Sequence, residues 1–247
     1  MKVIFHEEFY KVYTSDPAAE SGRMEAIVEV LKDRHEFIEA IPATEEEIAV
    51  VHTERHIGAV KKRGLFEISS LAAGAAIMSA RIGLTEPCFA LIRPPGHHAS
   101  KDSSWGFCYF NNMAVALTVI KNEGHIQSAF ILDIDLHYGD GNVNILGESG
   151  WVRILNPNAR TRDEFKRNIA TTMAGLKTDI IGISAGFDNH INDWGGLLTT
   201  DDFESTGALA ASTAKNAGAG YFAILEGGYN HSVLGRNVEA LLKGMQF

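Results

Sequence analysis

The chain has 247 residues, of which 45% are hydrophobic and 21% charged, and its net charge is −9. This composition is typical of a globular protein, and the length suits one large domain, which we expect to span residues 1–247. The acidic balance disfavours a broad phosphate-binding surface and therefore a nucleic-acid partner. The chain contains no run of about 20 apolar residues, so a membrane-spanning helix is not expected.

The cysteine content and the N-terminus both favour a cytoplasmic location. The two cysteines, Cys88 and Cys108, do not form a CxxC pair, and we expect both to be reduced thiols. The segment Met1–Glu8 turns acidic before the apolar core of a signal peptide could form.

Short apolar runs rich in β-branched residues recur along the chain and predict buried strands. They lack strict polar alternation, as expected of strands buried on both faces of a parallel sheet. In chain order the runs are Val3–Phe5, Cys88–Ile92, Ala129–Ile134, Val152–Leu155, Ile180–Ser184 and Tyr221–Leu225.

Longer stretches between these runs predict helices. They are Ala19–Asp33, Glu67–Ile82, Asn112–Asn122, Arg162–Leu176, Thr200–Asn216 and Ser232–Lys243. A shorter helix should begin at Glu45, where Thr44 can cap the N-terminus and Glu47 completes a capping box. Because strands and helices alternate, we expect a single α/β domain with a mainly parallel sheet flanked by helices on both faces.

Reactive polar residues follow the apolar runs, where the carboxyl ends of parallel strands bind ligands. These segments are Arg93–His98, Asp133–His137, Ala185–Asp188 and Glu226–Tyr229. In an extended chain, Asp133, Asp135 and His137 would share one face while Ile134 and Leu136 pack inward. Two carboxylates and an imidazole suit zinc.

An alternative for this segment is a surface turn around Gly139-Asp140-Gly141, but the apolar run upstream calls for burial. Asp188 follows another strand and could supply a third ligand. One histidine and two aspartates leave a fourth position for water, as a catalytic zinc site requires.

The adjacent histidines His97 and His98 follow a rigid Pro-Pro-Gly turn and suit general acid–base chemistry near neutral pH. Each imidazole needs an acceptor that orients it, and Asp133 and Asp140 are the natural candidates. Tyr229 follows a glycine turn, from which its hydroxyl could approach a substrate carbonyl; alternatively, it packs at a helix start.

Several segments together resemble the histone deacetylase and acetylpolyamine amidohydrolase family. They are RPPGHH (93–98), WGFCYFNN (105–112), DIDLHYGDG (133–141), SAGFDNH (184–190) and LEGGY (225–229), and they occur in the family's order. The resemblance implies the arginase–deacetylase type of fold. It also implies a zinc-dependent deacetylase that hydrolyses an N-acyl amine, such as an acetylpolyamine or an acetyl-lysine peptide, to a free amine and a carboxylate.

The resemblance further implies a role for each matching residue. Asp135, His137 and Asp188 would bind one Zn²⁺ per chain. His98, oriented by Asp140, would act as general base and then as general acid, while His97, paired with Asp133, would act through its electrostatics. Tyr229 would donate a hydrogen bond to the scissile carbonyl, and Gly106 and Phe107 would line the substrate channel.

The chain departs from the family pattern between two predicted strands. Only Asn156 to Asp179 separates them, where the family usually carries a longer glycine-rich insertion that includes a second aromatic wall of the channel. We therefore expect a wider groove, or one closed by a neighbouring subunit in a homo-oligomer. Trp105 and Trp194 place bulky indoles beside motifs where they are unusual, so either could reshape the entrance.

The family also commonly binds structural K⁺ through backbone carbonyls and a hydroxyl from the next strand. The carbonyls of Asp133, Asp135 and His137 would be available here, but the run Val152–Leu155 offers no serine or threonine. Potassium is thus a secondary expectation.

Two other functions compete with the deacetylase interpretation. An arginase-type ureohydrolase shares this fold but needs carboxylates for two manganese ions, whereas the later motif is Asp188-Asn189-His190 and not Asp-x-Asp. A non-catalytic binding member of the fold is disfavoured because His98, Asp188 and Tyr229 are all present.

Overall fold

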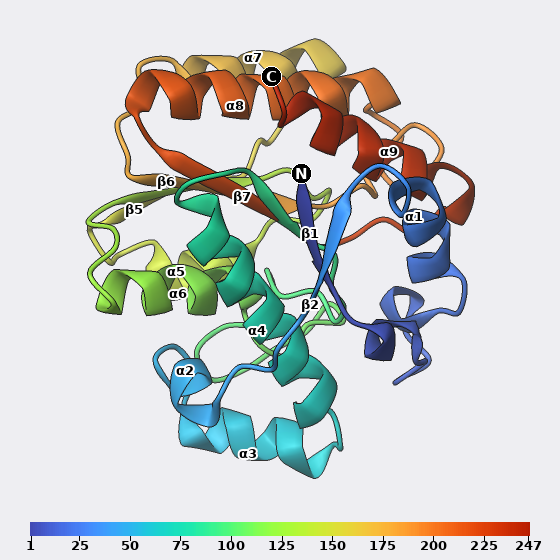
Figure 1. Ribbon diagram of the computed structural model, residues 1–247, viewed down its shortest axis with the longest axis vertical. Helices are drawn as coiled ribbons and strands as arrows, with labels where there is room; N and C mark the ends of the chain where they lie inside the picture. The colour runs from blue at the N-terminus through green and yellow to red at the C-terminus, as the bar shows by residue number, and fades with distance from the viewer.

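Seven parallel strands form one sheet through the centre of the protein (Figure 1). The computed structural model describes residues 1–247. The strands are β1 (Lys2–Phe5), β2 (Glu36–Glu39), β3 (Cys88–Ala90), β4 (Ala129–Asp133), β5 (Val152–Leu155), β6 (Ile180–Ala185) and β7 (Gly220–Leu225). Their order in the sheet is β2-β1-β3-β7-β6-β4-β5.

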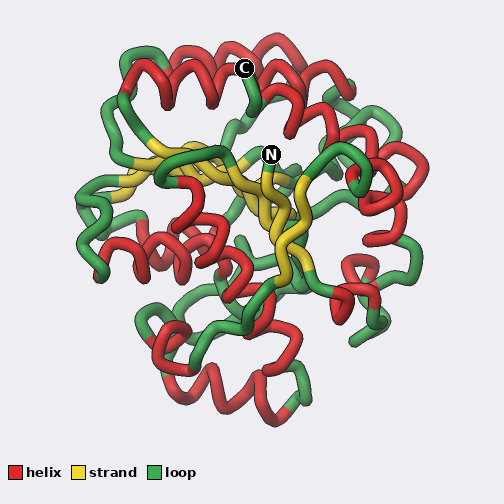
Figure 2. Tube along the Cα trace, viewed as in Figure 1, coloured by secondary structure: helices red, strands yellow, loops and turns green.

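Nine α-helices surround the sheet. They are α1 (Arg23–Leu31), α2 (Glu45–Ala49), α3 (Glu54–Lys62), α4 (Phe66–Gly83), α5 (Asn112–Asn122), α6 (Asp140–Leu146), α7 (Arg162–Met173), α8 (Thr200–Ala217) and α9 (His231–Gly244), with 3₁₀ turns at Glu7–Tyr10 and Pro17–Ala19. Helices α1, α7, α8 and α9 cover one face and α4, α5 and α6 the other, as the red helices on either side of the yellow strands show in Figure 2. The predicted α/β fold with a parallel sheet is confirmed.

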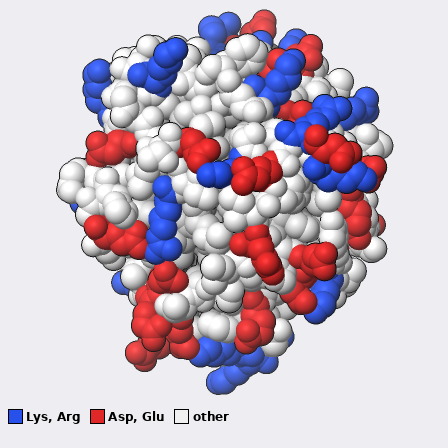
Figure 3. Space-filling view, in the orientation of Figure 1, with Lys and Arg blue, Asp and Glu red and all other residues white.

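The central strands are buried on both faces, as their unbroken apolar sequences predict. Every residue of β4 and β6 is buried, and the core is one continuous cluster drawn from strands and helices alike. Acidic and basic groups are interspersed on the face shown in Figure 3. None of the helices combines the length and apolar character that crossing a membrane requires.

Three elements were absent from the sequence prediction. Strand β2 reads Glu-Phe-Ile-Glu at the sheet edge, where its acidic ends face solvent. Helix α3 is mostly charged and buries only His56, Ile57 and Val60. Helix α6 is seven residues long and begins Asp-Gly-Asn, a sequence of weak helix formers that we interpreted only as a turn.

Several predicted boundaries also differ from the structure, and two of them have a clear local cause. The strand predicted over Cys88–Ile92 ends at Ala90, ahead of the Arg93–Pro94 turn. The helix predicted from Ala19 begins at Arg23 because Gly22 adopts a left-handed backbone conformation with a φ of 88°. The capping box of α2 is confirmed, because Thr44 Oγ1 accepts from the Glu47 N–H at 3.2 Å and Glu47 Oε2 accepts from the Thr44 N–H at 2.9 Å.

The topology places one crevice at the carboxyl edge of the sheet. After β3 the chain passes through α5 and enters the sheet again at β4, which is separated from β3 by β7 and β6. Because all strands are parallel, the loops that follow β3, β4, β6 and β7 leave at the same edge. Such reversals of strand order are where open α/β sheets bind ligands.

Close packing of α8 on α9 makes Gly207 a sensitive position. A Cβ atom there would lie 2.3 Å from the Leu241 carbonyl oxygen. We expect Gly207→Ala to lower the free energy of unfolding by about 1–3 kcal/mol, because neither helix backbone can move freely. Gly58→Ala is the control: its Cβ meets nothing within 4 Å on α3, and it should raise stability by up to about 1 kcal/mol. Urea denaturation measures both, and equal shifts in one direction would contradict the packing argument.

Candidate active site

Asp135, His137 and Asp188 converge at the carboxyl edge of the sheet. Their candidate ligand atoms all lie within 4.8 Å of one another. His137 Nδ1 lies 3.1 Å from Asp135 Oδ1 and 3.0 Å from Asp188 Oδ2. Both carboxylates are buried and the imidazole is partly exposed. One imidazole and two carboxylates make a donor set that can hold a divalent metal while leaving a position open.

The loop after β4 is turned by backbone hydrogen bonds to these carboxylates. Strand β4 ends at Asp133, and of the two side chains expected to pack inward beyond it, Ile134 is buried as predicted whereas Leu136 is 37% exposed. Instead, Asp135 Oδ1 accepts from the His137 N–H at 2.9 Å, and Asp188 Oδ1 accepts from the Leu136 N–H at 3.0 Å. The carboxylates therefore shape the loop that carries the imidazole.

The electrostatics of the three residues fit a bound cation. Burial and the Asp135 charge raise the pKa of Asp188 to about 6, and the adjoining carboxylates of Asp135 and Asp188 raise the pKa of His137 to about 10. Asp188 Oδ2 is buried and lies close to His137 Nδ1, but in a geometry that makes no hydrogen bond. A divalent cation among these groups would supply both the missing partner and the missing positive charge.

Glycines let the backbone approach these carboxylates closely. A Cβ atom at Gly186 would lie 2.1 Å from Asp135 Oδ2, and one at Gly227 would lie 2.6 Å from the same oxygen. The Gly227 N–H donates to that oxygen at 2.9 Å. The loops after β6 and β7 thus form a cradle in which any larger residue would displace a carboxylate.

His97 is held among carboxylates. Its Nδ1 lies 3.2 Å from Asp133 Oδ2, which also accepts from Asn142 Nδ2 at 3.1 Å. Burial alone would lower the pKa of His97, but the charges of Asp135 and Asp133 raise it well above its ordinary value. This imidazole is therefore suited to carrying a positive charge.

His98 has the opposite environment. Burial and the neighbouring His97 charge lower the pKa of His98 to about 4, although Asp140 opposes this shift. His98 Nδ1 lies 2.7 Å from Asp140 Oδ1, and Asp140 is the first residue of α6, where the helix dipole favours a carboxylate. A neutral imidazole with an oriented Nδ1–H leaves Nε2 able to accept a proton.

These side chains border a pocket of about 310 Å³. It is lined by Pro95, His97, His98, Trp105, Gly106, Phe107, His137, Trp194, Gly227 and Tyr229. The structure thus brings the predicted channel residues Gly106 and Phe107 together with both predicted histidines and Tyr229. Gly106 has a φ of 58°, and a Cβ there would lie 2.4 Å from His98 Cδ2, so the chain passes directly against the imidazole.

Two indoles also line this pocket. The Trp105 ring lies over His98 with centroids 3.9 Å apart, and the Trp194 ring stacks on Tyr229 at 4.0 Å. We expected the short chain to lack a second aromatic wall, yet Trp194, in the loop after β6, contributes aromatic surface. A hollow of about 400 Å³ between 135–138 and 156–160 marks the side where the insertion is missing.

The sequence analysis gave no role to two residues that hold this site together. Glu226 Oε2 accepts from the N–H groups of Gly96 and His97 at 2.6 and 3.2 Å, and burial raises the pKa of Glu226 to about 7. Asp193 Oδ2 accepts from the N–H groups of Tyr229 and Asn230, each at 2.8 Å. Glu226 opens a polar run after β7 and was detectable, whereas Asp193 carries no sequence signal.

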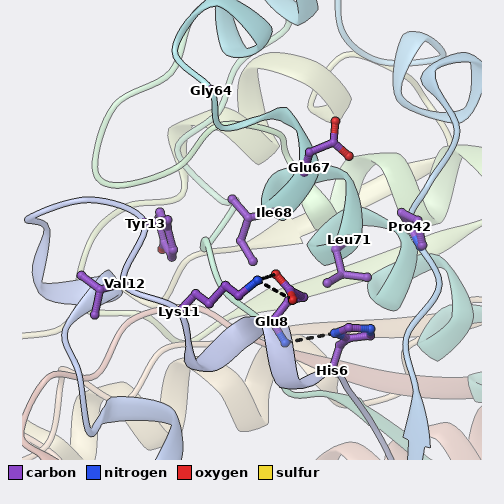
Figure 4. A pocket seen from close by; sticks show the side chains of 10 residues that line it. All are labelled: His6, Glu8, Lys11, Val12, Tyr13, Pro42, Gly64, Glu67, Ile68 and Leu71. Carbon is purple, nitrogen blue, oxygen red and sulfur yellow. Dashed lines mark hydrogen bonds and ion pairs between the residues drawn. The ribbon is translucent and has the colours of Figure 1, made fainter.

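A larger cavity of about 490 Å³ contains none of the predicted site residues (Figure 4). Its lining includes the ion pair between Glu8 and Lys11 and apolar side chains such as Ile68 and Leu71. Size alone therefore does not locate the reactive groups, which are concentrated in the smaller pocket.

Comparisons with known proteins agree with the geometry. A family model described as the histone deacetylase domain matches residues 62–157 and 155–245. A probable deacetylase of Archaeoglobus fulgidus is 30% identical over 92% of this chain and 81% of its own length. Polyamine deacetylase HDAC10 of Danio rerio is 26% identical over 96% of this chain and 46% of its own length. The crystal structure of the HDA15 HD domain superposes with a TM-score of 0.84 at 25% identity, covering 98% of this chain and 88% of that one. The chain belongs to the histone deacetylase family.

Proposed function

We propose that this protein is a zinc-dependent deacetylase that hydrolyses an N-acyl amine to a free amine and a carboxylate. The observation that carries the proposal is that the triad Asp135, His137 and Asp188 adjoins the pocket containing His98 and Tyr229. The relatives named deacetylases support this reaction class.

Asp135, His137 and Asp188 would hold one zinc ion per chain. Zinc, when bound, polarises a substrate carbonyl and lowers the pKa of water toward about 7. A structural potassium ion stays a prediction, because β5 provides no side-chain hydroxyl to complete its ligands.

His98 would move the protons of the reaction. With Nδ1 engaged by Asp140, its Nε2 takes a proton from the attacking water and later gives it to the leaving amine. The low pKa of His98 keeps it neutral at the start of the cycle. His97, held by Asp133, contributes positive charge near the developing oxyanion and does not act as the base.

Tyr229 would stabilise the tetrahedral intermediate. Burial raises the pKa of its hydroxyl far above the ordinary value, so the hydroxyl stays protonated and able to donate to the carbonyl oxygen. One well-placed donor of this kind contributes about 3–4 kcal/mol. Gly106 and Phe107 would border the path of the acylated side chain.

We infer that the substrate is a small acylated amine such as an acetylpolyamine, with an acetyl-lysine peptide as the other candidate. The aromatic rings around the pocket can attract the cationic part of such a molecule. Both cysteines are free and buried, in keeping with a cytoplasmic enzyme. Closure of the groove by a second subunit stays a prediction.

The central test is amine release from a panel of acetylpolyamines and acetyl-lysine peptides by purified protein, before and after chelation. We expect turnover that the chelator abolishes and added zinc restores. Preference within the panel then identifies the substrate class. Metal-loaded protein that releases no amine from any member would rule out this function in favour of a binding role.

Asp188→Asn should weaken zinc retention by about 10–100-fold, because a neutral amide replaces a buried charged ligand. Zinc per chain is measured by atomic emission after dialysis against a graded chelator. Asp163→Asn, which alters an exposed carboxylate on α7, is the matched control and should retain zinc like the wild type. Equal retention by both variants would remove Asp188 from the ligand set.

His98→Ala should lower kcat by about 10²–10⁴-fold, because it removes the proton acceptor, while zinc content stays unchanged. Steady-state kinetics and metal analysis on the same preparation separate the two effects. His125→Ala, at a half-exposed histidine, should leave both unchanged. Near wild-type turnover by His98→Ala would show that another group is the base.

A further inference from the structure

Trp105 contacts both members of the His98–Asp140 pair. Its Nε1–H donates to Asp140 Oδ2 at 2.9 Å, while the other carboxylate oxygen, Oδ1, lies 2.7 Å from His98 Nδ1. The indole ring also lies over the imidazole, with centroids 3.9 Å apart and planes at 32°. The three side chains therefore form a closed triangle in which each touches the other two.

The two kinds of contact constrain different motions. Because both oxygens of Asp140 are engaged, its carboxylate cannot rotate freely. The orientation of Oδ1, the oxygen that faces His98 Nδ1, is therefore set. Ring contacts restrict the plane of the imidazole, which packs against both the Trp105 ring at 3.9 Å and the His97 ring at 4.0 Å between centroids. A single hydrogen bond to His98 Nδ1 would leave its ring free to tilt.

The indole packs on the buried member of a pair whose carboxylate stays partly open to water. The side chain of Asp140 is 33% exposed, whereas that of His98 is only 3% exposed. A hydrogen bond to a carboxylate is stronger where water is excluded from it. The neighbouring Gly106, which has no side chain, lets this segment lie directly on the imidazole.

Trp194 provides an internal comparison. It lines the same pocket and is 53% exposed, against 55% for Trp105, but it stacks on Tyr229 and its indole N–H makes no hydrogen bond to a carboxylate. The two indoles thus make distinct contacts, and only Trp105 is connected to the proton-transfer pair.

We propose that Trp105 is a positioning residue for His98: its N–H fixes Asp140 and its ring face fixes the imidazole plane. This inference rests on the proposed function, since only there does His98 act as base. Trp105 does not exchange protons itself. Loss of its N–H should therefore reduce the rate of the chemical step, while a phenylalanine ring that keeps the aromatic face in the pocket should leave substrate binding nearly unchanged.

A double-mutant cycle tests the connection. Trp105→Phe keeps an aromatic face but removes the N–H, and we expect it to lower kcat by about 10-fold with KM changed less than about 3-fold. In an Asp140→Ala background the same substitution should lower kcat by less than about 2-fold, because the indole N–H no longer has its acceptor. Trp105→Leu also removes the aromatic face, and its kcat should be lower than that of Trp105→Phe.

Trp151→Phe is the control for removing an indole, because Trp151 lies outside the pocket beside β5. It should leave kcat and KM unchanged, and thermal denaturation verifies that each variant is folded. A wild-type kcat for Trp105→Phe, or an equal loss in both backgrounds, would overturn the proposal.

A second readout needs neither metal nor turnover. The chain has three tryptophans, so three indole N–H signals are expected in a ¹H–¹⁵N spectrum. Asp140→Ala should move the Trp105 signal upfield and leave the Trp151 signal in place. An unmoved Trp105 signal would overturn the proposed contact. If wild-type protein hydrolysed no acyl amine, the proposed function would fail while this spectrum still decided whether Trp105 holds Asp140.

Discussion

Burial of several acidic groups at one edge of the sheet is the constraint on which the rest of the site depends. Asp133, Asp135, Asp188 and Glu226 are all nearly or completely inaccessible to solvent. Removing carboxylates from water is costly unless each is paired or hydrogen-bonded. Backbone N–H groups and imidazoles satisfy most of their oxygens, but Asp188 Oδ2 and Glu226 Oε1 have no hydrogen-bond partner. A divalent cation at the triad would compensate this remaining negative charge.

The same acidic cluster gives two adjacent histidines opposite properties. His97 faces the carboxylates and has a raised pKa, whereas His98 lies beyond His97, is buried, and has a pKa lowered to about 4. Glu226 accepts from the backbone of the turn that carries both rings, so the acidic cluster also sets their positions. The proposed mechanism uses this difference, because it assigns electrostatic stabilisation to His97 and proton transfer to the neighbouring His98.

Much of this arrangement could be predicted from the sequence because it follows from burial. Apolar runs identified six of the seven strands, and polar residues just after them identified the site edge. Short-range patterns failed where long-range contacts decide the structure. The inward packing expected of Leu136 failed where its backbone N–H donates to Asp188, and the contact between Trp105 and Asp140 joins positions 35 residues apart. Edge strand β2 escaped prediction because half of its short sequence is charged.

Different elements carry the reactive centre and the walls of the pocket. The candidate metal triad, both histidines and Asp133 come from strand ends and the loops that follow them, and Asp140 begins helix α6, so the sheet and its helices hold them in place. The pocket walls come from loops, which tolerate replacement. Here a hollow borders His137 where the chain is short, while Trp194 brings an indole against Tyr229 from the loop after β6. The HDA15 HD domain, at only 25% identity, shares this fold with a TM-score of 0.84, so the sheet can persist while most residues of the chain differ.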